Sequence, residues 1–303
     1  MSMFKVNSCF DKIDPYWYTR LLSIKTVYIT VIFFMVNLFF ELPSPPTLYM
    51  VVGIIGPLLA EMPSLNTQKQ KDSVILLFVV LAIFSLSVFA MIWYIKTWFI
   101  LVAFSWAYIL YTALKKKPAL FSVVSLIFLM GVMSLESPIK PASLNNMFNE
   151  IIYYFQFATI GFWAHKFFPN LYFRCWHSMM LRCIEAHMRS IKNNQVEFET
   201  YSRHLLAAQN VLPLLQSKPY AEQLNQFTQK MLELNYITDS YIRHNISSSE
   251  FSQYKANVTQ LYESIKSLKD YLSINTLSEN NLKVKHTIQD LFSSWKVICT
   301  KNC

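Results

Sequence analysis

The stretch between residues 42 and 71 constrains the fold of this chain more than any other part, because proline interrupts it where apolar segments meet. Its first part carries Pro43, Pro45 and Pro46. Proline lacks the backbone N–H that would continue a preceding helix, and it pushes the residue before it toward extended geometry. A tight turn is therefore predicted between the apolar segments on either side.

The second of these apolar segments is itself interrupted, by Gly53 and by the pair Gly56-Pro57. Irregular backbone is tolerated at membrane depth only where protein or a water-filled cavity surrounds it. A transporter or channel needs such a feature, whereas a plain membrane anchor does not. The alternative interpretation is a proline-kinked helix that packs against its neighbours and lines no pathway.

The apolar residues are distributed very unevenly along the 303 residues. The chain is 53% hydrophobic, but residues 21–168 are almost continuously apolar while residues 170–303 are polar, with a helical spacing of apolar positions. We therefore expect three parts: a cytoplasmic interfacial lead-in (residues 1–20), a transmembrane domain (21–168) and a cytoplasmic helical domain (169–303). The first apolar segment lacks a cleavage pattern and is expected to be a retained membrane helix.

Six apolar segments of nearly membrane-spanning length predict a six-helix transmembrane bundle. Their predicted bounds are Ser23–Phe40, Thr47–Met62, Val74–Ile92, Thr97–Leu114, Ala119–Leu135 and Met147–Phe168. Basic residues gather in alternate loops, including the run Lys115-Lys116-Lys117, so both termini are predicted to lie in the cytoplasm. The net charge of +9 is accordingly attributed to the basic loops that set the membrane topology, and nucleic acid is not an expected partner.

The residues after 169 predict an antiparallel helical bundle, because apolar side chains recur there at spacings of three and four. Helices are expected over Leu171–Asn193, Gln195–Leu212, Tyr220–Tyr241, Phe251–Leu268 and Ser278–Thr300. The fold class is therefore all-α. The five cysteines, Cys9, Cys175, Cys183, Cys299 and Cys303, all fall in predicted cytoplasmic parts and are expected to stay reduced.

The sequence offers no set of residues for catalysis. It has no Walker motif, no G-x-G-x-x-G and no G-x-S-x-G, so neither an enzyme nor an ATP-driven pump is expected. Cys183 and His187 lie four residues apart, with His177 upstream, but their spacing matches no structural zinc pattern, and no metal or cofactor is expected. His165 is interpreted as an interfacial histidine rather than a proton relay.

Candidate functional residues come from the interrupted helix and from the few polar positions in apolar segments. The expected substrate pathway comprises Lys25, Asn37, Pro43, Gly53, Gly56, Pro57 and Glu61. Lys69 and Lys71 are expected at the cytoplasmic mouth, where basic groups would raise the local concentration of anions. Because no carboxylate is predicted at mid-membrane depth, the sequence gives little support to proton coupling.

The layout resembles the fusaric acid resistance and aromatic acid exporter family. The resemblance rests on Ile24-Lys25-Thr26 at the start of the first segment, Leu42-Pro43-Ser44-Pro45 at the turn, and Pro63 followed by Lys69 and Lys71. It implies an inner or plasma membrane protein that exports small organic anions, typically aromatic carboxylates. Many members carry two such membrane units in one chain, so a homodimer or higher homo-oligomer is implied here. The plant aluminium-activated malate transporters, which are anion channels, are similar in plan.

Three functions remain open on the sequence. The leading one is a transporter or efflux component for small organic acids that acts as a homo-oligomer. A passive organic-anion channel is the second, since it needs a lined pore but no coupling site. The third is a membrane-anchored scaffold whose helical tail binds a partner.

The substitution Lys25→Glu is expected to reduce the flux of organic anions without harming membrane insertion, because it reverses a charge at the predicted mouth. Uptake of an aromatic carboxylate into proteoliposomes, normalised to inserted protein, measures the effect. Unchanged flux in a properly inserted variant would remove Lys25 from the mechanism.

Overall fold

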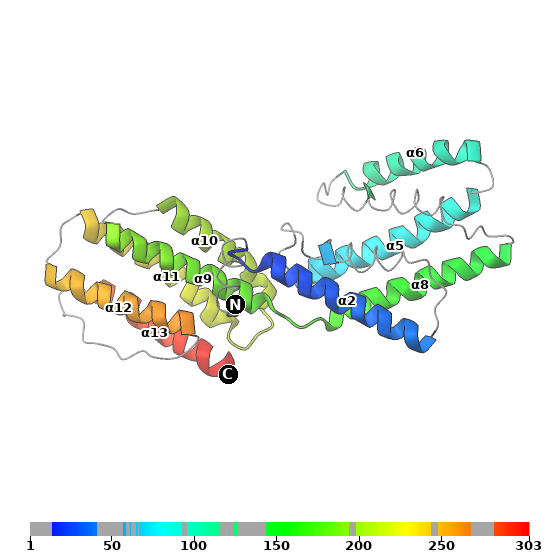
Figure 1. The fold of residues 1–303 in the computed structure, drawn as a ribbon. Helices are drawn as coiled ribbons and strands as arrows, with labels where there is room; N and C mark the ends of the chain where they lie inside the picture. Colours follow the sequence, from blue (N-terminus) through cyan, green and yellow to red (C-terminus); the bar gives the residue numbers. More distant parts are fainter. Residues whose placement is uncertain are drawn as a thin grey trace, which may run out of the picture. The chain divides into compact units, whose positions relative to one another are not determined.

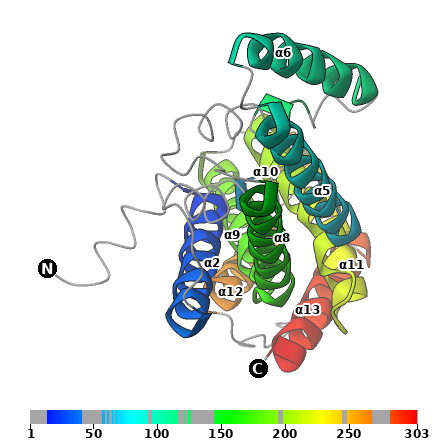
Figure 2. The ribbon, with the colours of Figure 1, turned by 90° about the vertical axis from the view of Figure 1, so that its right-hand side faces the viewer.

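The computed structural model describes residues 14–40, 57–58, 61, 65, 67–92, 96–115, 121, 124–125, 144–193, 198–243, 248–267 and 282–302. Every regular element in these ranges is a helix, which confirms the all-α prediction for this part of the chain (Figures 1 and 2). The residues divide into two compact units. We call residues 20–169 the apolar unit, and the described residues before Arg20 together with those from Asn170 onward the bundle unit.

Four long helices form the described part of the apolar unit: α2 (Tyr18–Phe40), α5 (Gln68–Ile92), α6 (Lys96–Ala113) and α8 (Leu144–Phe167). They correspond to the first, third, fourth and sixth predicted segments. Most of the second and fifth segments, with Pro43, Gly53 and Gly56, lies outside the described residues.

Two helices have the length and apolar composition needed to cross a membrane, over Tyr18–Phe39 and Gln68–Phe89. Only 22% and 31% of their most apolar windows are buried inside the structure, whereas a core helix of a soluble protein would be mostly buried. The apolar stretch of α6 is shorter, and α8 carries polar residues such as Asn149 and Gln156. By this measure the described helices give two candidate spans, fewer than the six segments expected.

The helices of the apolar unit pack through small clusters of apolar side chains. Ile29 and Phe33 of α2 are buried against Ala164 of α8. α5 contacts both α8 and α6 (Figure 1), and Phe89 packs on Ala103 in the second of these contacts. Polar groups within the helices find partners, as where the indole nitrogen of Trp106 donates to the hydroxyl of Ser85 at 2.8 Å.

The outward faces of the apolar unit are strongly hydrophobic. Among the described residues, all but three of the exposed large apolar side chains belong to this unit, the exceptions being Tyr18, Leu206 and Tyr236. Large side chains such as Phe39 (80% exposed) and Phe104 (64% exposed) point away from the protein. A monomeric soluble protein rarely exposes apolar surface on this scale, so these faces are expected to be covered by another apolar surface.

The bundle unit consists of five α-helices and one short 3-10 helix in its described residues. They are α9 (Tyr172–Asn193), α10 (Phe198–Val211), η3 (Leu212–Leu215), α11 (Ala221–Arg243), α12 (Ser248–Ser267) and α13 (Leu282–Asn302). These ranges follow the predicted helices closely, because apolar residues at spacings of three and four give each helix one buried stripe. Pro213 ends α10 and begins η3, as its missing N–H favours the start of a new turn.

The bundle core is mostly apolar and aromatic, and it encloses a polar cluster around His187. Trp176, Phe227 and Trp295 are fully buried and pack ring against ring. Deeper along α9, the Nε2 atom of His187 lies 2.9 Å from the hydroxyls of both Thr238 and Tyr254. Burial lowers the pKa of His187 from 6.5 to about 3, so the ring is neutral at physiological pH.

The three cysteines described, Cys175, Cys183 and Cys299, are buried and do not form disulfides. Burial raises the pKa of the Cys183 thiol to about 12, which makes it a structural rather than a reactive group. Its neighbour Tyr201 is also buried, and its hydroxyl donates to the backbone carbonyl of Met231.

The segment before α2 is tied to the bundle unit. The hydroxyl of Tyr16 and Nδ1 of His204 share a hydrogen bond of 2.6 Å, and the guanidinium of Arg174 lies 5.3 Å from the ring centre of Trp17. Burial raises the pKa of Tyr16 and lowers that of His204, so both groups are neutral and the phenol can donate to the imidazole. Trp17 adopts φ 66°, a left-handed conformation that non-glycine residues adopt rarely and that these contacts help to hold.

The bundle unit should lose stability as the pH falls below 6.5. His187 has a lowered pKa in the folded state, so the unfolded chain binds more protons, and the loss from this residue reaches about 1.4 kcal/mol per pH unit. The loss should continue down to about pH 3, the folded pKa. Urea unfolding of the detergent-solubilised chain, followed by tryptophan fluorescence between pH 7 and pH 5, measures it.

His187→Gln should reduce this pH dependence even though the variant is less stable overall. His286→Gln, at an exposed histidine of α13, provides the matched control and should leave the pH dependence as in the wild type. An identical pH dependence in the wild type and in His187→Gln would show that the buried imidazole is not responsible.

Candidate functional site

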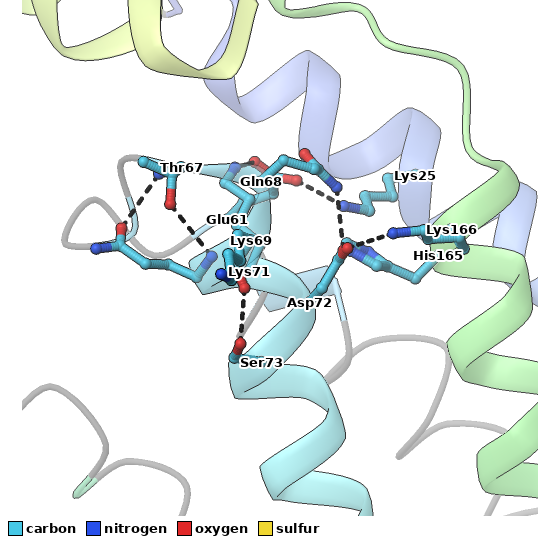
Figure 3. Close-up of polar contacts among 11 residues, drawn as sticks. Lys25, Glu61, Thr67, Gln68, Lys69, Lys71, Asp72, Ser73, His165 and Lys166 are labelled. Atoms are coloured by element: carbon cyan, nitrogen blue, oxygen red, sulfur yellow. Dashed lines mark hydrogen bonds and ion pairs between the residues drawn. The ribbon is translucent and has the colours of Figure 1, made fainter. Parts of the chain in front are cut away.

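A cluster of charged side chains lies inside the apolar unit, where α2, α5 and α8 meet (Figure 3). At its centre the carboxylate of Glu61 receives two lysines. Lys25 of α2 donates from Nζ to Oε1 at 2.6 Å, and Lys71 of α5 donates from Nζ to Oε2 at 2.6 Å. We call these three residues the lysine–glutamate bridge.

The bridge is almost completely shielded from solvent. The side chains of Lys25, Glu61 and Lys71 are exposed by only 2%, 6% and 3%. Removing such charges from water is costly, and the cost is offset only where every charge has close, well-oriented partners. One carboxylate shared by two ammonium groups provides those partners, but it leaves an excess of positive charge within the bridge.

Local backbone hydrogen bonds lie close to both Lys71 and Glu61. Before α5, the side-chain oxygen of Thr67 accepts from the backbone N–H of Gln70 at 3.2 Å, and Gln70 Oε1 accepts from the N–H of Thr67 at 3.2 Å. This reciprocal pair is a capping box, and it fixes the start of α5 immediately before Lys71. The backbone N–H of Glu61 donates to the carbonyl of Pro57 at 3.0 Å, the hydrogen bond between residues four apart that is typical of a helix.

A second group of charges continues the cluster toward α8. Lys166 pairs with Oδ2 of Asp72, and Gln68 donates to Oδ1 of Asp72 at 3.3 Å. Nε2 of His165 lies 3.5 Å from Oδ1 of Asp72, close enough for an electrostatic attraction if the ring is protonated but without a hydrogen bond. Lys166 is 46% exposed, so this end of the cluster reaches the surface of the unit.

An aromatic ring borders the bridge on its α8 side. Nζ of Lys25 lies 5.4 Å from the ring centre of Phe168, which also packs edge-on against Tyr28. The face of an aromatic ring attracts a cation, so Phe168 supports the charged state of Lys25 without neutralising it.

The structure brings together three of the residues selected from the sequence, Lys25, Glu61 and Lys71, and separates others from them. Asn37 lies on α2 roughly 18 Å along the helix axis from Lys25, given a rise of 1.5 Å per residue. Its Oδ1 is buried without a hydrogen-bond partner among the described atoms. Lys69 is exposed, and Pro57 is buried at the turn that precedes Glu61.

The setting of the lysines differs from the one that the sequence suggested. Lys25 and Lys71 were expected as basic groups at the cytoplasmic mouth, and the structure shows that their side chains are buried and paired with Glu61. Lys25→Glu would place a second carboxylate against Glu61, so we now expect it to impair folding or insertion as well as flux.

Sequence reasoning missed three members of the cluster, Asp72, His165 and Lys166, and one local signal. Asp72 was not singled out, and His165 was interpreted as an interfacial residue, although its side chain is only 3% exposed. The Thr-x-x-Gln pattern at Thr67 and Gln70 is a capping-box signature that would have placed the start of α5. No comparable signal in the sequence indicates that α8 supplies His165 to the same cluster.

The histidines and cysteine considered for a metal have other partners in the bundle unit. His177 Nε2 lies 2.6 Å from the carbonyl oxygen of Ile265, while His187 bonds Thr238 and Tyr254. In the described ranges no three histidine, cysteine, aspartate or glutamate side chains converge as metal ligands would.

No protein-family model, curated protein or solved structure matches the chain. The resemblance to the aromatic acid exporter family therefore stays a prediction from the sequence, and the geometry of the cluster carries the functional argument.

Lys25→Met should destabilise the apolar unit by about 2 kcal/mol, because Glu61 loses one buried charged hydrogen bond and keeps the one from Lys71. Lys166→Met is the matched control on the exposed side of the cluster and should cost less than about 1 kcal/mol. Thermal unfolding of both variants in detergent, referred to the wild type, measures the difference. Equal losses would contradict the assignment of Lys25 to the buried part of the cluster.

Proposed function

We propose that the chain is an integral, multi-pass membrane protein that transports small organic anions, in the manner of an efflux component. The observation that carries the proposal is the lysine–glutamate bridge, a buried and positively charged cluster inside helices with apolar outer faces. Transport rather than catalysis is proposed, because the cluster offers charges for binding but no activated nucleophile.

Placement in a membrane is supported by the exposed surface of the apolar unit. The side chains of α2 that point outward include Val27, Val31 and Phe34, with exposed fractions of 48% to 62%. Lipid chains would cover these faces at no cost in solvation, whereas water would not. We propose that α6, α8 and the segments outside the described residues add further membrane passes.

The orientation follows from the distribution of basic residues. Lys69 and Lys115 flank apolar helices on sides that the positive-inside rule assigns to the cytoplasm, and both termini are proposed to lie there. The protein would then sit in the inner or plasma membrane. A homo-oligomer is proposed because a single six-segment unit offers half the number of helices implied by the resemblance.

Anion binding is supported by the charges of the cluster. Among the described residues, the cluster contains three lysines, Lys25, Lys71 and Lys166, and two carboxylates, those of Glu61 and Asp72. Ionisable groups buried in a membrane unit are expensive and usually mark a pathway for substrates or ions. A scaffold that only anchored the bundle unit would have no need of such a cluster.

Transport should be visible as uptake of benzoate by proteoliposomes that contain the purified chain. Lys71→Met should lower the rate roughly ten- to hundredfold, since a hydrogen-bonded charge in a binding site is worth on the order of 1.5–3 kcal/mol. Lys69→Met removes an exposed charge two positions earlier on α5 and should retain at least about half the rate, because exposed charges are screened by salt.

Uptake by the same vesicles, measured with and without a pH gradient, distinguishes the possible energy sources of transport. Uptake that a pH gradient accelerates supports a coupled exporter, and uptake that follows only the anion's own electrochemical gradient, with measurable current, supports a channel. No uptake by the wild type under either condition would contradict the transport proposal and favour a membrane-anchored scaffold.

A further inference from the structure

The imidazole of His165 is buried but has no hydrogen-bond partner. Its side chain is only 3% exposed, and neither Nδ1 nor Nε2 is hydrogen-bonded to any atom in the ranges that the structure describes. The buried His187 of the bundle unit differs, because its Nε2 atom lies 2.9 Å from two hydroxyl groups. Buried polar groups are normally satisfied, so the unpartnered ring of His165 requires an explanation.

A carboxylate that can accept a further hydrogen bond lies beside this ring. Nε2 of His165 is 3.5 Å from Oδ1 of Asp72 (Figure 3). A hydrogen bond from a charged N–H to a carboxylate is about 2.8 Å long, so a small movement of the ring would complete one. Oδ1 also accepts from Gln68 at 3.3 Å, and Oδ2 pairs with Lys166. The two oxygens of a carboxylate have about four lone-pair sites, so Asp72 can accept from His165 and keep both of these partners.

Protonation changes what His165 can bind. The neutral ring has one N–H donor and one acceptor nitrogen, whereas the protonated ring has two donors. Asp72 can accept from one of them, but no acceptor is hydrogen-bonded to the other within the described residues. The carboxylate of an organic anion would supply that acceptor and would balance the added charge. A proton on the ring and an anion beside it therefore favour each other's binding.

We propose that His165 takes up one proton from solution for each organic anion that binds, and that its two N–H groups then donate to Asp72 and to the anion's carboxylate. The new N–H bond forms at the ring nitrogen that carried no proton, and a monovalent anion with this proton leaves the total charge of the site unchanged. The inference rests on the proposed function, because it names the residue that couples the anion to a proton.

Histidine suits this role better than the other charged groups of the cluster. The lysines already carry their protons at neutral pH, and each described carboxylate accepts from at least one ammonium group. Histidine is the side chain whose unperturbed pKa lies closest to neutral pH, so a change in its surroundings can switch its charge. The charged groups that surround the ring come from every element packed there: Lys25 on α2, Glu61 before α5, Lys71 and Asp72 on α5, and Lys166 on α8.

Calorimetric titration of the full chain in detergent with benzoate tests the proposal. Titrations in two buffers of different ionisation enthalpy give the number of protons taken up, and we expect about one per benzoate for the wild type at pH 7. Linkage then requires the affinity for benzoate to fall roughly tenfold for each pH unit by which the pH is raised, because the proton binds together with the anion.

His165→Gln should bind benzoate with almost no proton uptake and with an affinity that hardly depends on pH, because the amide can donate a hydrogen bond but does not titrate. Asp72→Asn should also lower the proton uptake, because the protonated ring loses its charged acceptor. His286→Gln, at the exposed histidine of α13, is the matched control and should take up protons as the wild type does.

The wild type and Asp72→Asn keep the proposal testable even if His165→Gln does not fold. Benzoate binding by the wild type without proton uptake overturns the proposal, as does undiminished proton uptake in His165→Gln or in Asp72→Asn. These results leave the proposed transport standing, because uptake of benzoate by vesicles measures transport separately. No benzoate binding by the wild type contradicts the role of His165, and the absence of vesicle uptake as well contradicts transport.

Discussion

The apolar unit depends on one carboxylate placed between two ammonium groups. Lys25 and Lys71 belong to helices that are otherwise built for an apolar environment, and neither charge is tolerable there alone. Glu61 holds them together, so it fixes the register in which α2 meets the start of α5. The capping box at Thr67 and the turn at Pro57 are the local structures that make this meeting possible.

The two units are both helical, but they bury opposite kinds of side chain. The bundle unit buries Trp176, Phe227 and Trp295 and turns polar residues outward, whereas the apolar unit exposes its aromatic side chains and encloses its charges. Each unit also has a polar cluster in its interior. In the bundle unit the cluster of His187 is neutral and fully hydrogen-bonded at Nε2, which specifies packing. In the apolar unit the cluster is charged, which is costly for packing and therefore points to function.

The local spacing of apolar residues predicts where the helices lie, but it does not predict which helices pack together. Apolar spacing placed α9, α11 and α12 within a few residues, because each helix needs one buried stripe whatever it packs against. Lys25 and Glu61 were both selected from the sequence, as rare charges near apolar segments. The ion pair between these two residues was not predicted, because it depends on how segments distant in the sequence come together. Asp72 and His165 belong to the cluster for the same tertiary reason, so inspection of their own segments could not identify them.

The contact between Tyr16 and His204 sets an order of events during synthesis. The two residues are 188 positions apart, and the whole apolar unit lies between them in the chain. At 5–20 residues per second, Tyr16 leaves the ribosome roughly 10–40 seconds before its partner exists. The bundle unit therefore cannot be completed until the helices of the apolar unit have been made. Closure of this long loop is a late step, which joins the first described residues to α10 only after the segments between them have been synthesised.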